Sequence, residues 1–475
     1  MIKSLRIRKK SSTFAAAFCR RSWYILVLTV LVMKENKKPY IAGWGYRIFK
    51  SYVRFYNDHL LYRHSYYLDK ENLPPLGEPC LIVSNHQNCA NDPLNLLLGL
   101  ENRSHPFVIA RGNIFSWNPL LTKFFLWLGM LPAFRLSHEG AESLSKNDET
   151  IRVSGGKMLE GNRLIMYPEG VHQHIRWLGD FSFGYTRMAF QTAEKDGFKR
   201  DIKIVPAVNH YSDYRAVQAD MLIRFGEPVS LAPYYELYKE KPRTAQREVN
   251  KLVRERIQAM MLDVRDLDHY DEIDWIRNSE FGSEYCRKKS LNSEYLPDKL
   301  QSDKQLVAAL ADFADWDVVR EIREEEERLR INDIDLSKRK SILTLSASVL
   351  AQTLLLPLWV CTLYPNIFHY NIHRPFLRTD DMYTNSYRLI APVVVGLPFF
   401  FLLTVLFCGL MWGWWWQSAL WMLLVTYPLS LFAFYEWKWM KNTWQGIRLL
   451  CHKAQVDALM EKRTKLFDNL RKTIL

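Results

Sequence analysis

The sequence predicts an α/β protein, in which a sheet flanked by helices is followed by a C-terminal α-helical membrane region. Two observations carry this prediction. Between residues 75 and 260, short apolar runs alternate with helical stretches, and Gly and Pro lie at the ends of the runs. Beyond residue 340, two uncharged stretches of roughly 23 and 22 residues, 342–364 and 389–410, are long enough to span a bilayer.

The domain that contains the sheet is predicted to cover residues 41–265. Residues 41–70 place aromatic side chains at helical spacing among Arg and Lys, which fits a helix packed on the domain or one at a membrane interface. Residues 244–265 read as a further helix. The candidate strands are the apolar runs 80–83, 107–110, 131–134, 164–167, 202–208 and 221–225.

Residues 1–40 form a separate basic and apolar N-terminal segment. Its apolar run, 23–33, is too short to cross a hydrocarbon core of about 30 Å. No small-residue cleavage site follows, so a secretory signal is a poor fit. Two interpretations remain, a surface anchor or sequence upstream of the true start. Because Met33 and the lysine-rich residues after it resemble a natural bacterial beginning, we hypothesise that Met33 is the true start.

The C-terminal half divides into three regions. Residues 266–340 are strongly charged and are predicted to be a helical linker without a catalytic role. Residues 341–436 hold the membrane segments, with burial in a soluble core as the alternative. The positive-inside tendency favours a dip into the membrane at 342–364 and a hairpin at 389–436, because both keep the basic clusters on the cytoplasmic side. Residues 437–475 form a basic amphipathic helix, which lies on anionic lipid or packs on a partner.

The charge balance favours an anionic partner. The chain has 64 Lys and Arg against 51 Asp and Glu, a net charge of +13. It shows no nucleic-acid motif, so membrane lipids and a phosphorylated substrate are the expected partners. The 7 Cys are scattered without metal-ligand spacing and indicate reduced thiols in a cytosol-facing protein. His172 and His174 have no third ligand in reach, so no metal site is predicted.

Two motifs carry candidate chemistry. His86 lies at the end of a predicted strand and Asp92 follows six residues later, a pattern in which a carboxylate orients a histidine base. The second motif, Tyr167-Pro168-Glu169-Gly170, follows another predicted strand. Each has a plainer interpretation, as loop residues that satisfy backbone groups or as an ordinary turn. The Ser residues form no Gly-x-Ser-x-Gly pattern, which gives a hydrolase triad little support.

Four blocks in order, over about residues 50–230, resemble the glycerolipid acyltransferase family, which acts on 1-acylglycerol 3-phosphate or glycerol 3-phosphate. The blocks are His86 with Asp92, 129–135, 167–170 and 204–208. Two departures stand out. Five residues separate His86 from Asp92, where the family usually has four. After Gly170 comes Val171-His172-Gln173 in place of the family's common Thr-Arg-Ser.

The resemblance implies a glycerolipid-acyltransferase-like sheet with His86 as the base and Asp92 as its orienting partner. It implies that Arg135, Glu169 and Gly170 bind the substrate phosphate. Arg111, His172 and Arg187 are further candidates for that role, and Arg176 is a possible substitute for the missing basic residue. No metal or cofactor is implied, since acyl-CoA or an acyl carrier protein thioester is the donor substrate.

The expected function is that of a membrane-bound O-acyltransferase in phospholipid biosynthesis. It would transfer a fatty acyl group to 1-acyl-sn-glycerol 3-phosphate and form phosphatidic acid. The alternatives are an acyltransferase for glycerol 3-phosphate or another lysolipid, and a catalytically inactive membrane scaffold. The expected location is a bacterial inner membrane, with transmembrane helices and the active site facing the cytoplasm.

Overall fold

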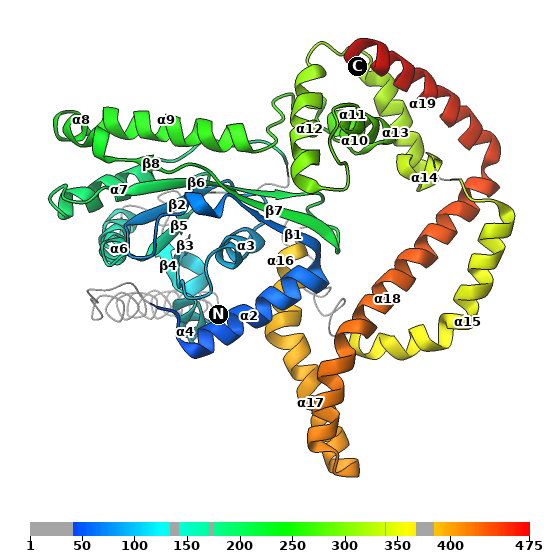
Figure 1. Ribbon diagram of the computed structural model, residues 1–475, viewed down its shortest axis with the longest axis horizontal. Helices are drawn as coiled ribbons and strands as arrows, with labels where there is room; N and C mark the ends of the chain where they lie inside the picture. The colour runs from blue at the N-terminus through cyan, green and yellow to red at the C-terminus, as the bar shows by residue number, and fades with distance from the viewer. Residues whose placement is uncertain (1–40, 117, 134–141, 171–174, 338, 367–383) are drawn as a thin grey trace, which may run out of the picture.

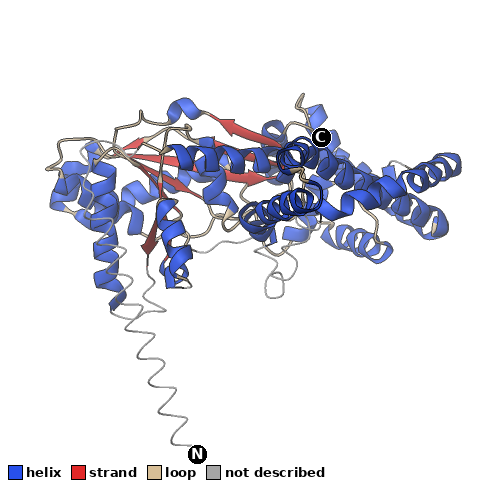
Figure 2. Ribbon diagram, turned by 90° about the horizontal axis from the view of Figure 1, so that it is seen from below, coloured by secondary structure: helices blue, strands red, loops and turns tan. Residues whose placement is uncertain are grey.

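The computed structural model describes residues 41–475, except 117, 134–141, 171–174, 338 and 367–383. The N-terminal segment with Met33 lies outside the described residues. So do Arg135 and His172, two of the expected substrate-binding residues. Figure 2 shows the sheet toward one side of the molecule and most helices of the C-terminal half toward the other.

Within the described residues, eight strands form one mixed sheet in the order β1-β7-β6-β2-β5-β3-β4, with β8 paired to β6. Strands β2 to β6 run parallel to one another. Strands β7 and β8 run antiparallel to β6, and β1 is parallel to β7. The strands are β1 Tyr62–Leu68, β2 Cys80–Ser84, β3 Phe107–Arg111, β4 Met130–Ala133, β5 Arg163–Met166, β6 Lys203–Tyr211, β7 Ala219–Phe225 and β8 Val229–Ser230.

All six predicted strands lie in this sheet, so the predicted fold class is confirmed. The stretch 41–70 is helical only in its first part. Helix α2 covers Trp44–Tyr56 and continues as the π-helical turn η1, Asn57–Leu61, before β1 begins. The second half of the stretch, rich in Tyr, pairs with β7 as a strand, which suits the high β-propensity of aromatic residues.

Helices cover both faces of the sheet (Figure 1). In that view α2 and α3 lie below the sheet and α8 and α9 above it. The remaining elements of this domain are η2 Lys70–Asn72, α3 Asn91–Gly99, η3 Gly112–Ser116, α4 Pro119–Trp127, α6 Glu142–Leu159, α7 Gly184–Lys195, η4 Ala232–Tyr234, α8 Tyr235–Glu240 and α9 Pro242–Met260.

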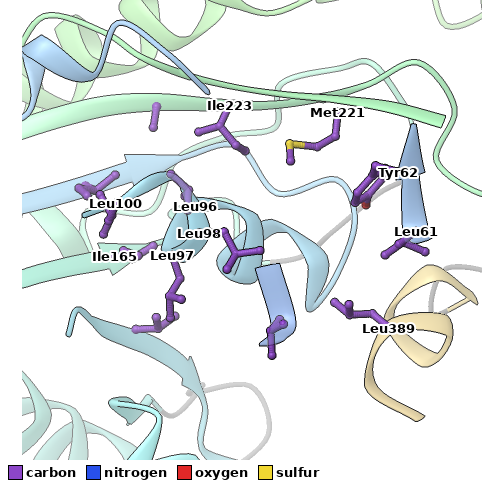
Figure 3. Packing of buried hydrophobic residues seen from close by; sticks show 14 of the residues in the cluster. Leu61, Tyr62, Leu96, Leu97, Leu98, Leu100, Ile165, Met221, Ile223 and Leu389 are labelled. Atoms are coloured by element: carbon purple, nitrogen blue, oxygen red, sulfur yellow. The ribbon is translucent and has the colours of Figure 1, made fainter. Parts of the chain in front are cut away.

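Successive residues of the central strand β2 belong to two different cores. Ile82 packs in the cluster shared with α2 and α3, part of which Figure 3 shows. Leu81 and Val83 pack in the opposite cluster, with α7 and α9. A strand buried on both faces is apolar at every position, which is why the candidate strands appeared in the sequence as continuous runs.

The charged segment 266–340 is more than a linker. Its helices pack around a third buried cluster that includes Phe281, Val319 and, from the C-terminal helix, Phe467. The cluster reaches the sheet through Leu222 of β7. The helices are α10 Tyr270–Asn278, α11 Glu280–Lys288, α12 Leu296–Ala309, α13 Trp316–Leu329, α14 Asp333–Ser337 and the C-terminal α19 Lys453–Ile474. The apolar face of the amphipathic helix α19 is therefore covered by its own chain, and not by lipid.

Between α14 and α19 lie the apolar elements α15 Ile342–Asn366, α16 Thr384–Ile390, η8 Ala391–Gly396, α17 Leu397–Trp412 and α18 Trp415–Cys451. Two stretches, Ile342–Thr362 with 21 residues and Ser386–Trp412 with 27, are long and apolar enough to cross a membrane. Helices α17 and α18 pack as a helical hairpin, which turns at Gly413, where φ is 68°. The second arm, α18, continues to Cys451, beyond the expected limit at 436, and a membrane hairpin at 389–436 stays a prediction.

The expected dip at 342–364 is wrong in its local structure, because α15 is one continuous helix. Pro357 removes one hydrogen bond of the helix and leaves the rest of its ladder in place. Gln352, the one side-chain amide of this stretch, donates its Nε2–H to Oγ1 of Thr443 on α18 at 2.9 Å. Its polar group is thus satisfied between two helices and does not interrupt α15.

Candidate active site

The candidate site lies at the edge of the sheet where β2 and β5 end. The two strands are parallel neighbours, and Val83 is aligned with Met166. The chain leaving β2 carries His86, and the chain leaving β5 carries Glu169. The sheet thereby brings together two motifs that are some eighty residues apart in the sequence.

His86 and Asp92 form a hydrogen-bonded pair. Nδ1 of His86 lies 2.8 Å from Oδ2 of Asp92, and the side chains are 18% and 0% exposed, respectively. The extra residue between them is accommodated in a tight turn, where Asn91 N–H donates to the carbonyl of Asn88 at 2.9 Å. Within this turn Cys89 has a φ of 41°, a left-handed conformation that is uncommon for a residue other than glycine. The unusual spacing therefore does not prevent the pairing.

Asp92 accepts four hydrogen bonds from described residues. Besides His86, the backbone N–H groups of Gln87 and Asn88 donate to its Oδ2 at 2.7 and 2.8 Å. The Tyr211 hydroxyl donates to its Oδ1 at 2.7 Å. With Nδ1–H of His86 directed at the carboxylate, Nε2 is the ring nitrogen that carries the lone pair. This tautomer suits a general base.

Glu169 is held by backbone groups. The N–H of His86 donates to its Oε1 at 2.8 Å, and the N–H of Gly179 donates to its Oε2 at 3.0 Å. A Cβ at Gly179 would come within 2.8 Å of Oε2, so a larger residue there would displace the carboxylate. Burial raises the pKa of Glu169 to about 7, against the effect of both N–H groups. Glu169 thus joins the two loops of the site.

Tyr167 and Gly170 shape the surroundings of the histidine. The ring of Tyr167 stacks on His86 with centroids 4.4 Å apart and an angle of 30° between the planes. Burial raises the pKa of the Tyr167 hydroxyl well above its ordinary value. Gly170 has a φ of 66° and turns the chain after Glu169, which most other residues do at a cost.

The remaining predicted substrate-binding residues are more scattered. Arg111 ends β3 at the same edge of the sheet and is exposed. Burial raises the pKa of the Cys89 thiol and the charge of Arg111 opposes this, so the guanidinium lies within electrostatic reach of the His86 loop. Arg187, on α7, forms an ion pair with Asp148 of α6 at 2.8 Å. The structure thus brings His86, Asp92, Glu169 and Gly170 together, but it engages Arg187 elsewhere.

Arg176 is committed to a structural position. Its guanidinium is buried and donates to the carbonyl of Tyr211 at 2.9 Å. It also lies 3.6 Å from the carboxylate of Asp274 on α10 and 4.8 Å from the ring centre of Tyr214. It therefore connects the loop after Glu169 with β6 and with the charged helices.

Sequence reasoning missed a set of buried polar side chains that hold the His86 loop. Asn85 Nδ2–H donates to the carbonyl of Asn209 at 3.0 Å, and Asn209 N–H donates to Oδ1 of Asn85 at 2.8 Å, which ties β2 to β6. The other members are Gln87, Asn91, Asn95, Tyr62, Tyr211 and Tyr214. The density of Asn between residues 85 and 95 was the available signal, since buried amides in a loop require partners.

Among the residues that the structure describes, no group of three His, Cys, Asp or Glu side chains is placed to hold a metal ion.

Comparison with known proteins locates a family domain in this part of the chain. A family model described as acyltransferase matches residues 64–209, a range that contains His86, Asp92 and Glu169. A solved structure, the 1-acyl-sn-glycerophosphate (LPA) acyltransferase PlsC from Thermotoga maritima, matches with 16% identity over 53% of this chain and 96% of that chain, at a TM-score of 0.31. The search of curated proteins found no match. Residues 64–209 thus match an acyltransferase-family domain, in agreement with the resemblance that the motifs carry.

Proposed function

We propose that this protein is a membrane-bound O-acyltransferase that transfers a fatty acyl group from a thioester to 1-acyl-sn-glycerol 3-phosphate. The product would be phosphatidic acid, for phospholipid synthesis. The observation that carries the proposal is the His86–Asp92 pair, 2.8 Å apart, within the acyltransferase domain.

In the proposed mechanism, Nε2 of His86 takes the proton from the acceptor hydroxyl as the hydroxyl oxygen attacks the thioester carbonyl. The imidazolium that forms is stabilised by Asp92. Collapse of the tetrahedral intermediate breaks the carbon–sulfur bond, and the leaving thiolate takes the proton back from His86. The step needs no acyl-enzyme, and burial keeps the pKa of the nearby Cys89 thiol raised.

The acceptor phosphate would be bound by arginine. Arg111 lies at the correct edge of the sheet, and Arg135 and His172 are assigned by the family resemblance alone. Because both oxygens of Glu169 accept backbone hydrogen bonds, we assign it to positioning the His86 loop. Arg187 ranks last for phosphate binding, since it already pairs with Asp148.

The apolar helices support a membrane location. The stretch Ser386–Trp412 exposes large apolar side chains along its length, including Phe399, Leu402 and Phe407. Both the acyl chain and a lysolipid acceptor dissolve poorly in water, so a site beside such helices suits these substrates. Acyl-CoA and acyl carrier protein are cytosolic donors, which favours an active site that faces the cytoplasm of a bacterial inner membrane.

The test is an acyl-transfer assay on the full chain in detergent. A labelled acyl-CoA or acyl carrier protein thioester is supplied with either glycerol 3-phosphate or 1-acyl-sn-glycerol 3-phosphate. We expect phosphatidic acid from the second acceptor and a loss of about 10²- to 10⁴-fold in His86→Ala, the range that a general base contributes.

A matched control is His269→Ala, because His269 also pairs with an aspartate, Asp266, at 2.7 Å but lies among the charged helices. If His86 is the general base, the His269→Ala variant should keep full activity. If only a monoacyl product forms, the acceptor is glycerol 3-phosphate and not 1-acyl-sn-glycerol 3-phosphate. If no acyl group is transferred to either acceptor, two alternatives remain: an acyltransferase for another lysolipid, and a catalytically inactive membrane scaffold.

A further inference from the structure

The element that leads into the apolar hairpin is embedded in the acyltransferase domain. Leu389 of α16 and Val393 of η8 are 2% and 4% exposed and belong to the same buried cluster as Leu61 and Leu97 (Figure 3). The Tyr52 hydroxyl of α2 donates to the carbonyl of Val393 at 3.1 Å. Helix α16 is therefore a fixed part of the domain, although it starts the more apolar of the two described stretches that are long enough to cross a membrane.

Ser386, near the start of α16, reaches the loop that carries the His86–Asp92 pair. It is 3% exposed, and its Oγ accepts the backbone N–H of Ala90 at 3.0 Å, across 296 positions of sequence. Ala90 lies between the two members of the pair. The same hydroxyl adjoins the Cys89 thiol, whose pKa burial raises and the Ser386 hydroxyl lowers.

The loop lacks an acceptor of its own at this position. Ala90 is the N-cap residue of α3, so its N–H is one of those that a helix start leaves without an intrahelical partner. The side chain that can accept this N–H is the one at the third helical position, which here is Pro93 and has no acceptor. Oδ2 of Asp92 is occupied by His86, Gln87 and Asn88. Cys89 holds a left-handed backbone conformation, which persists only where its surroundings enforce it. Ser386 supplies the missing acceptor at the strained turn.

We propose that Ser386 is a positioning residue for catalysis, through which the apolar hairpin fixes the geometry of the His86–Asp92 pair. The proposal rests on the proposed function for its kinetic consequences. Ser386 does not touch the reacting groups. It acts through the Ala90 N–H, which holds the turn that sets His86 against Asp92.

Loss of the Ser386 hydroxyl leaves a buried N–H without its acceptor and allows the turn to relax. We expect Ser386→Ala to lower kcat by about tenfold, the equivalent of one lost buried hydrogen bond, and to leave KM for the thioester unchanged. The acidic limb of the pH–rate profile should move to lower pH, because a looser Asp92 contact stabilises the imidazolium less. Ser386→Thr, which keeps the hydroxyl, should retain most of the activity.

The matched control is Ser418→Ala. Ser418 is a buried serine of the same hairpin, and its Oγ donates to carbonyls of its own helix. The four proteins are compared in one detergent. An unchanged kcat and pH profile in Ser386→Ala would overturn the proposal. An equal loss of kcat in Ser418→Ala would also overturn it, because the effect would then come from a general disturbance of the hairpin.

A second readout does not depend on activity. Amide hydrogen exchange of peptides that cover residues 86–96 should accelerate in Ser386→Ala and stay as in the wild type in Ser386→Thr and Ser418→Ala. If the wild type transfers no acyl group to either acceptor, the proposed function fails, while this exchange still tests the contact. Unchanged exchange in Ser386→Ala would overturn the positioning role by itself.

Discussion

Two carboxylates, Asp92 and Glu169, both hydrogen-bond His86, but they are held in different ways. Asp92 is fully buried and accepts from the imidazole, from two backbone N–H groups and from the Tyr211 hydroxyl. Among the described residues, Glu169 accepts from two backbone N–H groups, and burial raises its pKa to about 7. The first carboxylate orients the base itself, whereas the second holds the backbone that carries the base.

The difference assigns separate tasks to the two groups. A side-chain contact to the imidazole acts on the proton transfer, so its loss affects the chemical step. A backbone contact acts on the position of the loop, and here its strength depends on pH, because Glu169 changes its charge near neutrality. Three substitutions separate these tasks, and a fourth tests a residue outside the two carboxylates; they follow in decreasing order of expected effect.

The largest effect is expected for Asp92→Asn. The amide keeps the shape of the side chain but removes the charge that stabilises the imidazolium, so we expect kcat to fall by about 10³- to 10⁴-fold. Steady-state kinetics with a saturating thioester measures it. A circular dichroism spectrum like that of the wild type shows that the loop alone is affected. A loss below about tenfold would contradict the role of Asp92 as the orienting group.

Glu169→Gln should have a smaller effect on kcat that depends on pH. At about pH 8 the ionised Glu169 makes charge-assisted bonds that the amide cannot make, so we expect a loss of about tenfold. At about pH 5 the wild-type side chain is mostly neutral, and the two proteins should be closer. The effect is measured as the ratio of kcat of the wild type to kcat of Glu169→Gln between about pH 5 and 8. A ratio that does not change with pH would show that the charge of Glu169 does not affect catalysis in this range.

The same variant has a predictable stability profile. The pKa of Glu169 is raised from 4.5 to about 7, so the stability that it contributes is complete below about pH 4.5 and is lost as the pH rises through 7. The melting temperature of the wild type relative to Glu169→Gln should therefore decrease from about pH 5 to about pH 8. A difference in melting temperature between the two proteins that does not change with pH would show that burial does not perturb the pKa of Glu169.

Tyr211→Phe removes one of the four donors to Asp92 and leaves the other three. We expect kcat to fall by about fivefold, in keeping with one hydrogen bond to a charged group that retains other partners. KM for the thioester should not change. Initial rates in detergent measure both parameters, and a loss as large as that of Asp92→Asn would mean that Tyr211 contacts the substrate directly.

The smallest effect is expected for Arg187→Ala. Arg187 and Asp148 are both substantially exposed, and such surface ion pairs contribute little to stability. We expect KM for the acceptor to stay within about twofold of the wild type, since electrostatics at an exposed pair are largely screened. A titration with the acceptor lipid measures it. A tenfold rise in KM for the acceptor would show that Arg187 contributes to binding the acceptor phosphate.

Part of this architecture was open to prediction from the sequence. The apolar runs identified six strands because a sheet covered on both faces leaves a continuous signal. His86 with Asp92 and the turn at Glu169 were recognisable as motifs in order. The placement of Glu169 against the His86 backbone was not, since it depends on β2 and β5 being neighbours.

Other features required the three-dimensional arrangement. The charged segment 266–340 was predicted to be a linker, yet Glu326 within it is buried and accepts from Nε1–H of Trp275 at 2.8 Å. Tyr211 meets Asp92 only because β6 lies beside β2. Ser386 and Ala90 are separated by 296 positions, and nothing in the sequence around either residue indicates that they are in contact. Hydrogen bonds between distant segments leave no local pattern in a single sequence.

The anchoring of α16 has a consequence for biosynthesis. The sheet domain leaves the ribosome well before Leu389 and Val393, which complete its buried cluster. At about 5 to 20 residues per second, Ser386 follows Ala90 by roughly 15 to 60 seconds. During that interval the nascent domain has an open core and an incomplete catalytic loop. The chain order therefore makes the active site one of the last parts of the molecule to be finished, after most of the protein has been synthesised.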